Sequence, residues 1–492
     1  MVLELMTVRL MAPWFGQSQI VWTNVIGVVL AALAVGQWLG GRWAQRGDST
    51  RIVSVLLVAG ALSIALPDII ALAAPATLPQ DLKLDEAWPF VTYGSLLVAL
   101  LAVGVPMAAL GVVTPWLIRL SREASSAPGR VSGAVLGAGT LGSLAGTFGA
   151  THALLPAIGS AWSVRLAGAL LVSAGVVLMV AFRSGATQKA VGAFVLPVLL
   201  ALIPRHAPQV TTLASIETPY QTARVEVDEA GTRLLRINEG LDSFHSAFTP
   251  GQLWTERYFD AFVAPALVAP AGEDGMRRVL ILGLGGGTMA RQIHAVAPDV
   301  LVCGVEIDRK LVELGRAWFE LPESTQVLSG MDARVALRFS EVPSGAILVD
   351  AYAQQIYVPP HLCTEEFFQE LRARLLPHGV AALNVGGRTR EDPVVAAISG
   401  TFARVFPGAC MARVPGTRNM IVLGARDGGF DFDALREKLS APSASALGLQ
   451  EHLGWMVLGE DFAPVTPAGA RPLRDGDAPV EALAHAGWRA SS

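Results

Sequence analysis

The stretch VLILGLGGGTMARQIHAVAPDVLVCGVEID, residues 279–308, decides the fold of the second half of the chain. It joins an apolar run, a cluster of glycines, an amphipathic stretch and a second apolar run that ends on an acid. Short apolar runs on either side of a helical stretch are typical of parallel strands connected by a helix. The segment therefore predicts a strand–helix–strand unit with a glycine-rich first turn.

Three glycines and one acid in this stretch indicate a nucleoside ligand. Gly283, Gly285 and Gly287 allow the backbone to turn tightly and to approach a ligand without intervening side chains. Glu306 closes the second strand, where a carboxylate accepts hydrogen bonds from both hydroxyls of a ribose. A tight turn alone would also require glycine. The prediction of a nucleoside ligand therefore depends on the acid at the end of the second strand.

The pattern continues on both sides of this stretch. Apolar runs suited to buried parallel strands lie at 300–307, 346–350 and 380–385. Helices are expected between them, at 309–320 and 364–376. Residues 215–240 alternate apolar and polar around a turn at 229–231, which is typical of a β-hairpin. We expect a doubly wound α/β sheet that binds its ligand at the carboxyl ends of the strands.

Two further acids follow strands of this sheet. Asp332 comes after an expected third strand, where a carboxylate can receive the amino group of adenine. Asp350 ends the fourth strand and would point into the crevice beside the ligand. The alternative role of each acid is a helix N-cap or a turn residue.

The first 204 residues are apolar enough for a multi-pass membrane domain. The chain of 492 residues is 52% hydrophobic, with a mean hydropathy of +0.47, and its long uncharged stretches lie in this part. Spans are expected near 20–40, 52–73, 91–118, 131–156 and 161–182, and 190–203 is either a last span or a re-entrant piece. The small residues of 132–150 predict close helix packing.

The opening residues resemble the second half of a span, with Glu4 and Arg9 inside an apolar stretch. We expect these charges to be paired or to lie at the membrane interface, and a truncated start is the alternative. Arginines and lysines in the loops 41–51, 119–130 and 183–189 place those loops in the cytoplasm. The side of the second half then depends on whether 190–203 crosses the membrane.

Composition excludes several other kinds of site. A net charge of −4 gives no basic surface for nucleic acid. Cys303, Cys363 and Cys410 lie far apart without a CxxC spacing, and the eight histidines form no HExxH pair. We therefore expect no metal site, no disulfide framework and no nucleic acid partner.

The order of these residues resembles the spermidine synthase (polyamine aminopropyltransferase) family, in its membrane-fused bacterial form. The motifs that carry the resemblance are ETPYQ, the glycine loop, VEID, the Asp-Ala pair, AILVDAY and LCTEEFF. The resemblance implies a β-hairpin subdomain followed by a Rossmann-like domain of the class I methyltransferase type. It also implies a small-molecule amine acceptor such as putrescine and admits a homodimer.

The implied donor is decarboxylated S-adenosylmethionine, whose aminopropyl group passes to the amine and leaves methylthioadenosine. The resemblance assigns the nucleoside contacts to Gln221, Gly283, Gly285, Gly287, Glu306, Asp332 and Ala333. It makes Asp350 the catalytic proton acceptor, and Tyr258 begins the segment that matches the family's Tyr-His-Glu. Tyr352 either orients the amine or packs.

Three departures fall on the side that holds the cationic amines. Gly286, Phe259 and Ala353 stand where the family has an aspartate, a histidine and a second acid. An acceptor with fewer positive charges, a lipid-side substrate or intact S-adenosylmethionine would fit these losses. Two alternative functions thus stay open: an S-adenosylmethionine-dependent methyltransferase and a nucleoside-sensing membrane protein without chemistry.

The expected organisation has four parts. They are a multi-pass transmembrane helical domain at 1–204, a linker and β-hairpin subdomain at 205–276, a Rossmann-like catalytic domain at 277–425 and a helix with a loosely ordered tail at 426–492. We expect a protein of the inner cell membrane. Its catalytic half is expected in the cytoplasm, where the donor is made.

Overall fold

The computed structural model describes residues 1–45, 50–77, 89–123, 128–182, 195, 197, 199–200, 203, 211–238, 244–352, 358–387, 389–457, 462–467 and 471–490. The chain divides into two compact units. The helical unit comprises Met1–Gln209, Ile216–Thr222 and Asn238–Asp242, and the α/β unit comprises Val210–Ser215, Ala223–Ile237 and Ser243–Ser492.

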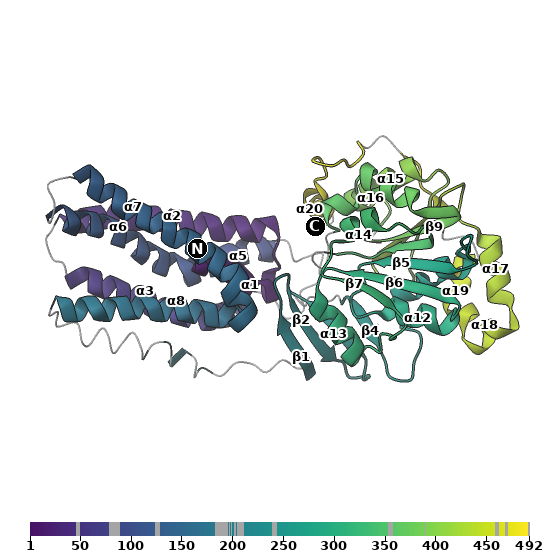
Figure 1. Cartoon of the computed structure of the whole chain (residues 1–492), viewed down its shortest axis with the longest axis horizontal. Helices are drawn as coiled ribbons and strands as arrows, with labels where there is room; N and C mark the ends of the chain where they lie inside the picture. Colours follow the sequence, from purple (N-terminus) through teal and green to yellow (C-terminus); the bar gives the residue numbers. More distant parts are fainter. Residues whose placement is uncertain are drawn as a thin grey trace. The chain divides into compact units, whose positions relative to one another are not determined.

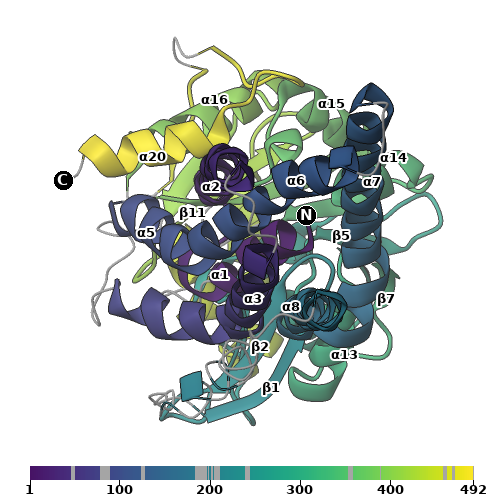
Figure 2. The same ribbon diagram turned by 90° about the vertical axis from the view of Figure 1, so that its left-hand side faces the viewer.

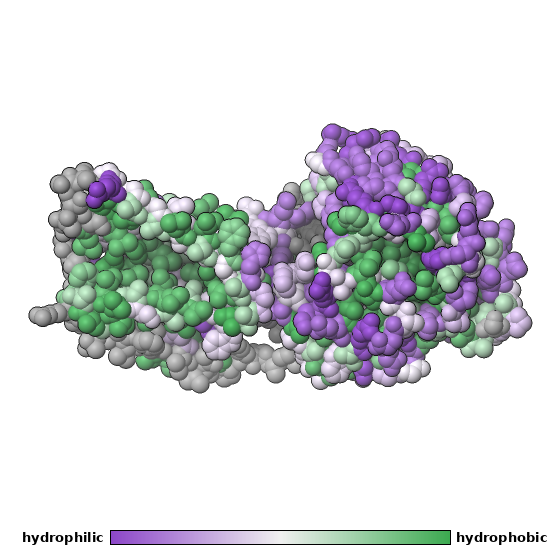
Figure 3. All heavy atoms as spheres, in the orientation of Figure 1, coloured by the Kyte–Doolittle hydropathy of each residue, from purple (hydrophilic) through white to green (hydrophobic). Residues whose placement is uncertain are grey.

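The helical unit is a bundle of long apolar helices (Figure 1). Its elements are α1 Val2–Phe15, α2 Gln19–Ala44, α3 Thr50–Ala76, η2 Phe90–Gly94, α5 Ser95–Ala99, η3 Leu100–Gly104, α6 Val105–Glu123, α7 Pro128–Gly149, η4 Ala150–Leu154 and α8 Leu155–Ala181. In Figure 2, α2 and α8 are seen nearly along their axes, with α3 beside α8. The coloured part of the face that Figure 3 shows is largely hydrophobic in this unit.

Four helices of the described chain are long and apolar enough to cross a membrane: Gln19–Ala44, Arg51–Ala76, Phe90–Leu120 and Gly129–Ala181. The fourth covers two of the expected spans. Its backbone leaves the helical region at Gly159, with a φ of 73°, between the spans expected at 131–156 and 161–182. Most of 190–203 lies outside the described residues.

Close helix packing occurs at other glycines than the expected ones. A Cβ on Gly36 of α2 would lie 2.0 Å from the Ala108 carbonyl oxygen of α6, and one on Gly60 of α3 would lie 2.8 Å from the Gly168 oxygen of α8. The small residues of 132–150 do not pack this way among the described residues. A Cβ on Gly137, for example, would meet nothing within 4 Å. Spacing alone did not reveal which helix faces meet.

Asp68 and Arg9 of the helical unit each form an ion pair. Asp68 of α3 is only 2% exposed and lies 3.3 Å from the guanidinium of Arg165 in α8. Arg9 of α1 donates to the carbonyl oxygens of Thr218 and Pro219 and forms an ion pair with Glu217. The prediction that Arg9 is paired is therefore confirmed, as expected for a charge among apolar helices.

The strands of the described chain form two sheets. The strands are β1 Thr211–Glu217, β2 Thr222–Val227, β3 Arg233–Ile237, β4 Ser246–Phe248, β5 Arg277–Leu282, β6 Val300–Glu306, β7 Gln326–Ser329, β8 Ser344–Val349, β9 Leu375–Gly386, β10 Cys410–Arg413, β11 Asn419–Ala425 and β12 Ala463–Pro464. The smaller sheet has the order β1-β2-β3-β4, and β2 and β3 form the expected hairpin. The larger sheet has the order β12-β10-β11-β9-β8-β5-β6-β7.

Strands β9, β8, β5, β6 and β7 are parallel, as expected for a doubly wound sheet. Strand β11 runs antiparallel to β9, and β10 runs antiparallel to β11. A tight turn closed by the hydrogen bond from Val414 N to Asn419 O joins these last two strands. The fold class is confirmed, with a mixed rather than purely parallel sheet.

Helices cover both faces of the larger sheet (Figure 1). They are α10 Tyr258–Ala261, α11 Val263–Val268, α12 Thr288–Val296, α13 Arg309–Trp318, α14 Ala333–Phe339, η5 Pro360–Leu362, α15 Glu365–Ala373, α16 Pro393–Val405, α17 Phe432–Ser440, α18 Pro442–Ala446, α19 Leu449–Val457 and α20 Val480–Ala490. One buried core lies under α11, α12, α17 and α19, and the other under α14, α15, α16 and α20. The segment after residue 425 thus contributes to both cores.

Candidate active site

The glycine loop lies at the carboxyl end of β5, before α12. Gly283, Gly285 and Gly287 have φ values of 92°, 56° and 88°, in the left-handed region that favours glycine. A Cβ on Gly283 would lie 2.4 Å from the carbonyl oxygen of Asp350. The loop therefore requires glycine both for its backbone conformation and for its approach to the end of β8.

Glu306 lies at the carboxyl end of β6 and contacts the loop directly. Its Oε2 accepts a hydrogen bond of 2.9 Å from Gly285 N, and its Oε1 accepts one of 3.0 Å from Asp308 N. Burial raises the pKa of the Glu306 carboxyl to about 7, against the opposing effect of these amide donors. The acid and the loop are thus one hydrogen-bonded group at the edge of the sheet.

Asp350 follows β8 and is held by two neutral donors. The Tyr258 hydroxyl donates to Oδ2 at 3.0 Å, and the Asn384 amide donates to Oδ1 at 2.8 Å. Burial raises the pKa of Asp350 to about 7, although both hydrogen bonds act in the opposite direction. Neither oxygen caps a helix, so Asp350 is not a helix N-cap.

Asn384 of β9 is a site residue that the sequence analysis missed. It is 4% exposed, and its Oδ1 accepts a hydrogen bond of 2.9 Å from the Asn419 amide of β11. The signal was present in the run VAALNV, because a polar residue in a buried strand requires a partner. Asn419 and Asn384 together orient the Asp350 carboxylate.

Tyr352 lies beside this group, but its hydroxyl is engaged with β9. It donates to Asn384 O at 3.0 Å and accepts from Gly386 N at 2.9 Å. Burial raises the pKa of Tyr352 and of Tyr258, and the Asp350 carboxylate raises both further. Both phenols therefore remain protonated and act as hydrogen-bond donors.

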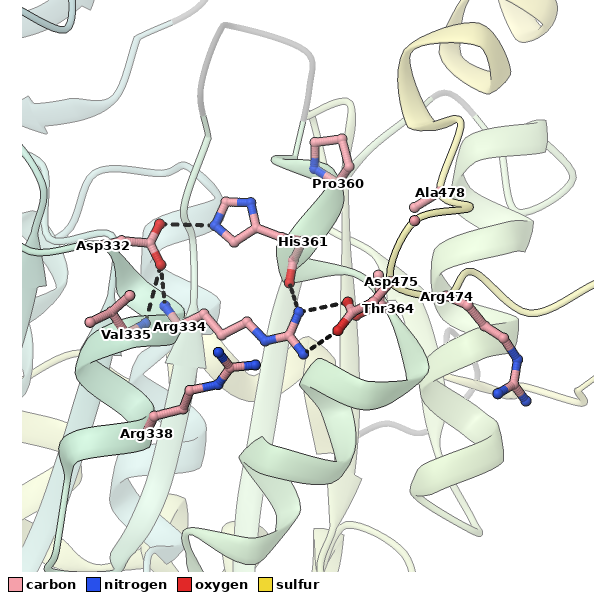
Figure 4. A pocket seen from close by; sticks show the side chains of 11 residues that line it. Asp332, Arg334, Val335, Arg338, Pro360, His361, Thr364, Arg474, Asp475 and Ala478 are labelled. Carbon is pink, nitrogen blue, oxygen red and sulfur yellow. Dashed lines mark hydrogen bonds and ion pairs between the residues drawn. The ribbon is translucent and has the colours of Figure 1, made fainter.

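Asp332 combines the two roles that the sequence left open. Its Oδ1 caps α14 by accepting from Arg334 N at 2.9 Å and Val335 N at 3.2 Å. Its Oδ2 lies 2.9 Å from Nε2 of His361 and lines a cavity of about 570 Å³ (Figure 4). Burial opposes ionisation, but the hydrogen bonds from His361 and the two amides lower the pKa of Asp332. Ala333 is the first residue of α14 and is 8% exposed.

The structure brings the glycine loop, Glu306 and Asp350 together, through the Gly285–Glu306 bond and the approach of Gly283 to Asp350. Gln221 belongs to the helical unit, where it is buried and its carbonyl oxygen accepts from Thr218 N.

Two comparisons identify the relatives of the chain, and no family model matches it. A probable polyamine aminopropyl transferase from Bifidobacterium longum is 34% identical over 201 residues, which cover 40% of this chain and 43% of that protein. A polyamine aminopropyltransferase from Chromobacterium violaceum is 33% identical over 113 residues, covering 23% of this chain and 43% of that protein. The chain is a relative of the polyamine aminopropyltransferases. It matches less than half the length of either aminopropyltransferase.

Other proteins share parts of the aminopropyltransferase-like region. The crystal structure of a probable spermidine synthase from Corynebacterium glutamicum covers 55% of this chain and 98% of that chain, at 24% identity and a TM-score of 0.41. The human eEF1A lysine and N-terminal methyltransferase is 27% identical over 158 residues, which cover 29% of this chain and 22% of that protein.

The described residues that depart from the aminopropyltransferase pattern pack in the core or form local hydrogen bonds. Phe259 is 1% exposed and packs against Phe244 in the core. Asp260 accepts hydrogen bonds from the Thr255 and Glu256 amides and from Gln292, so its carboxylate serves the local structure. A Cβ on Gly286 would lie 3.1 Å from the Phe319 ring, which leaves little space for a side chain. Ala353 lies outside the described residues.

Proposed function

We propose that this chain is a membrane-anchored aminopropyltransferase-like enzyme. It would move an aminopropyl group from decarboxylated S-adenosylmethionine to an amine acceptor such as putrescine and release methylthioadenosine. The observation that carries the proposal is the partly buried Asp350 carboxylate, oriented by Tyr258 and Asn384 beside the glycine loop. The curated aminopropyltransferase relatives support the same chemistry.

The nucleoside would lie along the carboxyl edge of β5, β6 and β7. The glycine loop would face the part of the donor near the sulfonium, and Glu306 would accept hydrogen bonds from both ribose hydroxyls. Asp332 would receive the adenine amino group beside Ala333. A positively charged sulfonium would also favour the ionised forms of Glu306 and Asp350, whose pKa values burial raises.

The reaction is a displacement at the carbon next to sulfur. The acceptor nitrogen forms a bond to this carbon, the carbon–sulfur bond breaks, and its electron pair neutralises the sulfonium. An ammonium has no lone pair, so Asp350 must first take a proton from the acceptor. General-base catalysis of this kind raises the reaction rate by about 10²–10⁴-fold. Alignment of nitrogen, carbon and sulfur contributes much of the remaining rate. Tyr258 would hold the carboxylate in place, whereas the Tyr352 hydroxyl is already engaged with β9.

Product analysis by mass spectrometry tests this function. Purified protein is incubated with decarboxylated or intact S-adenosylmethionine and a panel of monoamines and diamines. The proposal expects methylthioadenosine and an aminopropylated amine from the decarboxylated donor. Failure of the decarboxylated donor with every amine, despite measurable nucleoside binding, would refute it.

One observation favours a second candidate, an S-adenosylmethionine-dependent methyltransferase. Gly286 stands where the aminopropyltransferase pattern has an aspartate, and the space beside it is limited by Phe319. Without that aspartate, the carboxylate of the intact donor would meet no like charge at this position. The human methyltransferase relative is consistent with this candidate. Its product in the same experiment would be S-adenosylhomocysteine.

We further propose that the four long apolar helices place the enzyme in the inner cell membrane, with the α/β unit in the cytoplasm. The donor is made in that compartment. A reporter fused to the C-terminus tests the orientation: activity of a periplasmic reporter, rather than a cytoplasmic one, would overturn it.

A further inference from the structure

Arg334 organises the end of the candidate site that contains Asp332. Its guanidinium makes bidentate ion pairs with Glu370 of α15 and with Asp475 of the C-terminal segment. The remaining hydrogen bond, 3.1 Å long, goes from Nη1 to the carbonyl oxygen of His361. Arg334 is only 5% exposed, so these contacts fix the backbone of His361 next to the start of α14.

The Asp332 carboxylate has both oxygens engaged. Oδ1 accepts the two amides at the start of α14, and Oδ2 accepts from Nε2 of His361. Nε2 must carry the proton, because a carboxylate whose pKa is lowered has none to donate. The His361 side chain is 46% exposed and the Asp332 side chain 30%, so the imidazole can leave and return to water at little cost.

We propose that His361 is a latch that lowers the affinity for adenosine, because it holds Asp332 until the exocyclic amino group of a bound adenosine takes its place. The inference rests on the proposed function, where Asp332 receives the adenine amino group. Oδ1 already accepts two amides, so the amino group would bind at Oδ2, where the His361 ring lies. A ligand without a donor at that position leaves His361 in place, so the latch weakens the binding of adenosine and does not affect such a ligand.

Calorimetric titration of the full chain in detergent with methylthioadenosine tests this inference. The latch lowers the fraction of protein ready to bind, so its removal raises the affinity. We expect His361→Ala to bind about fivefold more tightly than the wild type, the factor that corresponds to about 1 kcal/mol. His361→Gln retains a donor near the position of Nε2 and should stay close to the wild type.

Two controls make the result specific. Methylthioinosine, with a carbonyl oxygen in place of the amino group, should gain nothing from His361→Ala. His294→Ala, in an exposed histidine of α12, should leave methylthioadenosine binding unchanged. Equal or weaker binding by a folded His361→Ala protein would overturn the latch while leaving the proposed function intact. If the wild type bound no methylthioadenosine, the proposed function would fail together with the latch.

Discussion

At the scale of single residues, the most informative feature is a carboxylate with only neutral hydrogen-bond donors. Asp350 receives hydrogen bonds from a phenol and an amide, and burial raises its pKa to about 7. A base with a pKa near the working pH combines a large ionised fraction with good proton affinity. The surroundings of Asp350 are thus suited to taking a proton from an amine.

Replacing Asp350 with asparagine should remove this base and preserve the shape of the site. We expect kcat to fall by about 10²–10⁴-fold, while methylthioadenosine binds as in the wild type. Steady-state kinetics and calorimetry measure the two effects. Asp299→Asn, which alters an exposed carboxylate paired with Arg277, is the control and should leave both unchanged.

The hydrogen bonds to Asp350 should be visible in the pH dependence. Asn384→Ala removes a donor that lowers the pKa of Asp350, so this pKa should rise above about 7. The acidic limb of the kcat/KM profile should move to higher pH by roughly 0.5–1 unit. Tyr258→Phe should move it in the same direction. An unchanged limb in both variants would exclude Asp350 as the titrating base.

Glu306 should make stability depend on pH. Its pKa is raised from 4.5 to about 7 in the folded protein, so the folded state binds the proton more tightly than the unfolded state. The unfolding free energy should therefore fall as pH rises between these two pKa values, by at most roughly 1.4 kcal/mol for each pH unit. Thermal unfolding without ligand at pH 5.5 and 8.0 should show a smaller decrease in Tm for Glu306→Gln than for the wild type.

At the scale of elements, local sequence patterns predicted many of the strands and helices, but not always which elements pack against each other. The buried strands β5, β6, β8 and β9 arose from apolar runs, as expected. The antiparallel strands β10 and β11 were not anticipated, because no helix separates them and their short runs carry no distinct period. The small residues of 132–150 indicated packing, whereas the close contacts lie between α2 and α6 and between α3 and α8.

The α2–α6 contact gives a prediction with a control on the same helix. A Cβ on Gly36 would lie 2.0 Å from a backbone oxygen, so Gly36→Ala should destabilise the bundle by about 1–3 kcal/mol or more. Gly41→Ala introduces the same methyl group where nothing lies within 4 Å and should be neutral or slightly stabilising. Thermal unfolding in detergent compares them. Equal losses of Tm would contradict the close packing.

At the scale of the whole molecule, residues far apart in the sequence complete the α/β unit. Leu473, Val480 and Ala484 are buried in the core beneath α14, α15 and α16. The Leu473 carbonyl oxygen accepts from Glu365 N, and Asp475 pairs with Arg334. The end of the chain is therefore part of the architecture that carries the candidate site.

Truncation after residue 470 should therefore destabilise the α/β unit. It removes three buried apolar side chains, whose loss costs several kcal/mol, and leaves Arg334 without one of its two carboxylate partners. We expect a marked fall in Tm and weaker methylthioadenosine binding. Arg471→Ala removes only an ion pair of an 85% exposed side chain and should change Tm little.

The sequence by itself determined the features that depend on neighbours along the chain. The glycine loop and the acids after β6, β7 and β8 could be predicted because parallel strands bring their carboxyl ends to one edge. Only the tertiary structure decided the partners of those acids. Asn384 and Tyr258 at Asp350, and His361 at Asp332, come from distant segments. Side-chain contacts between such segments depend on strand order and helix packing, which local sequence patterns do not encode.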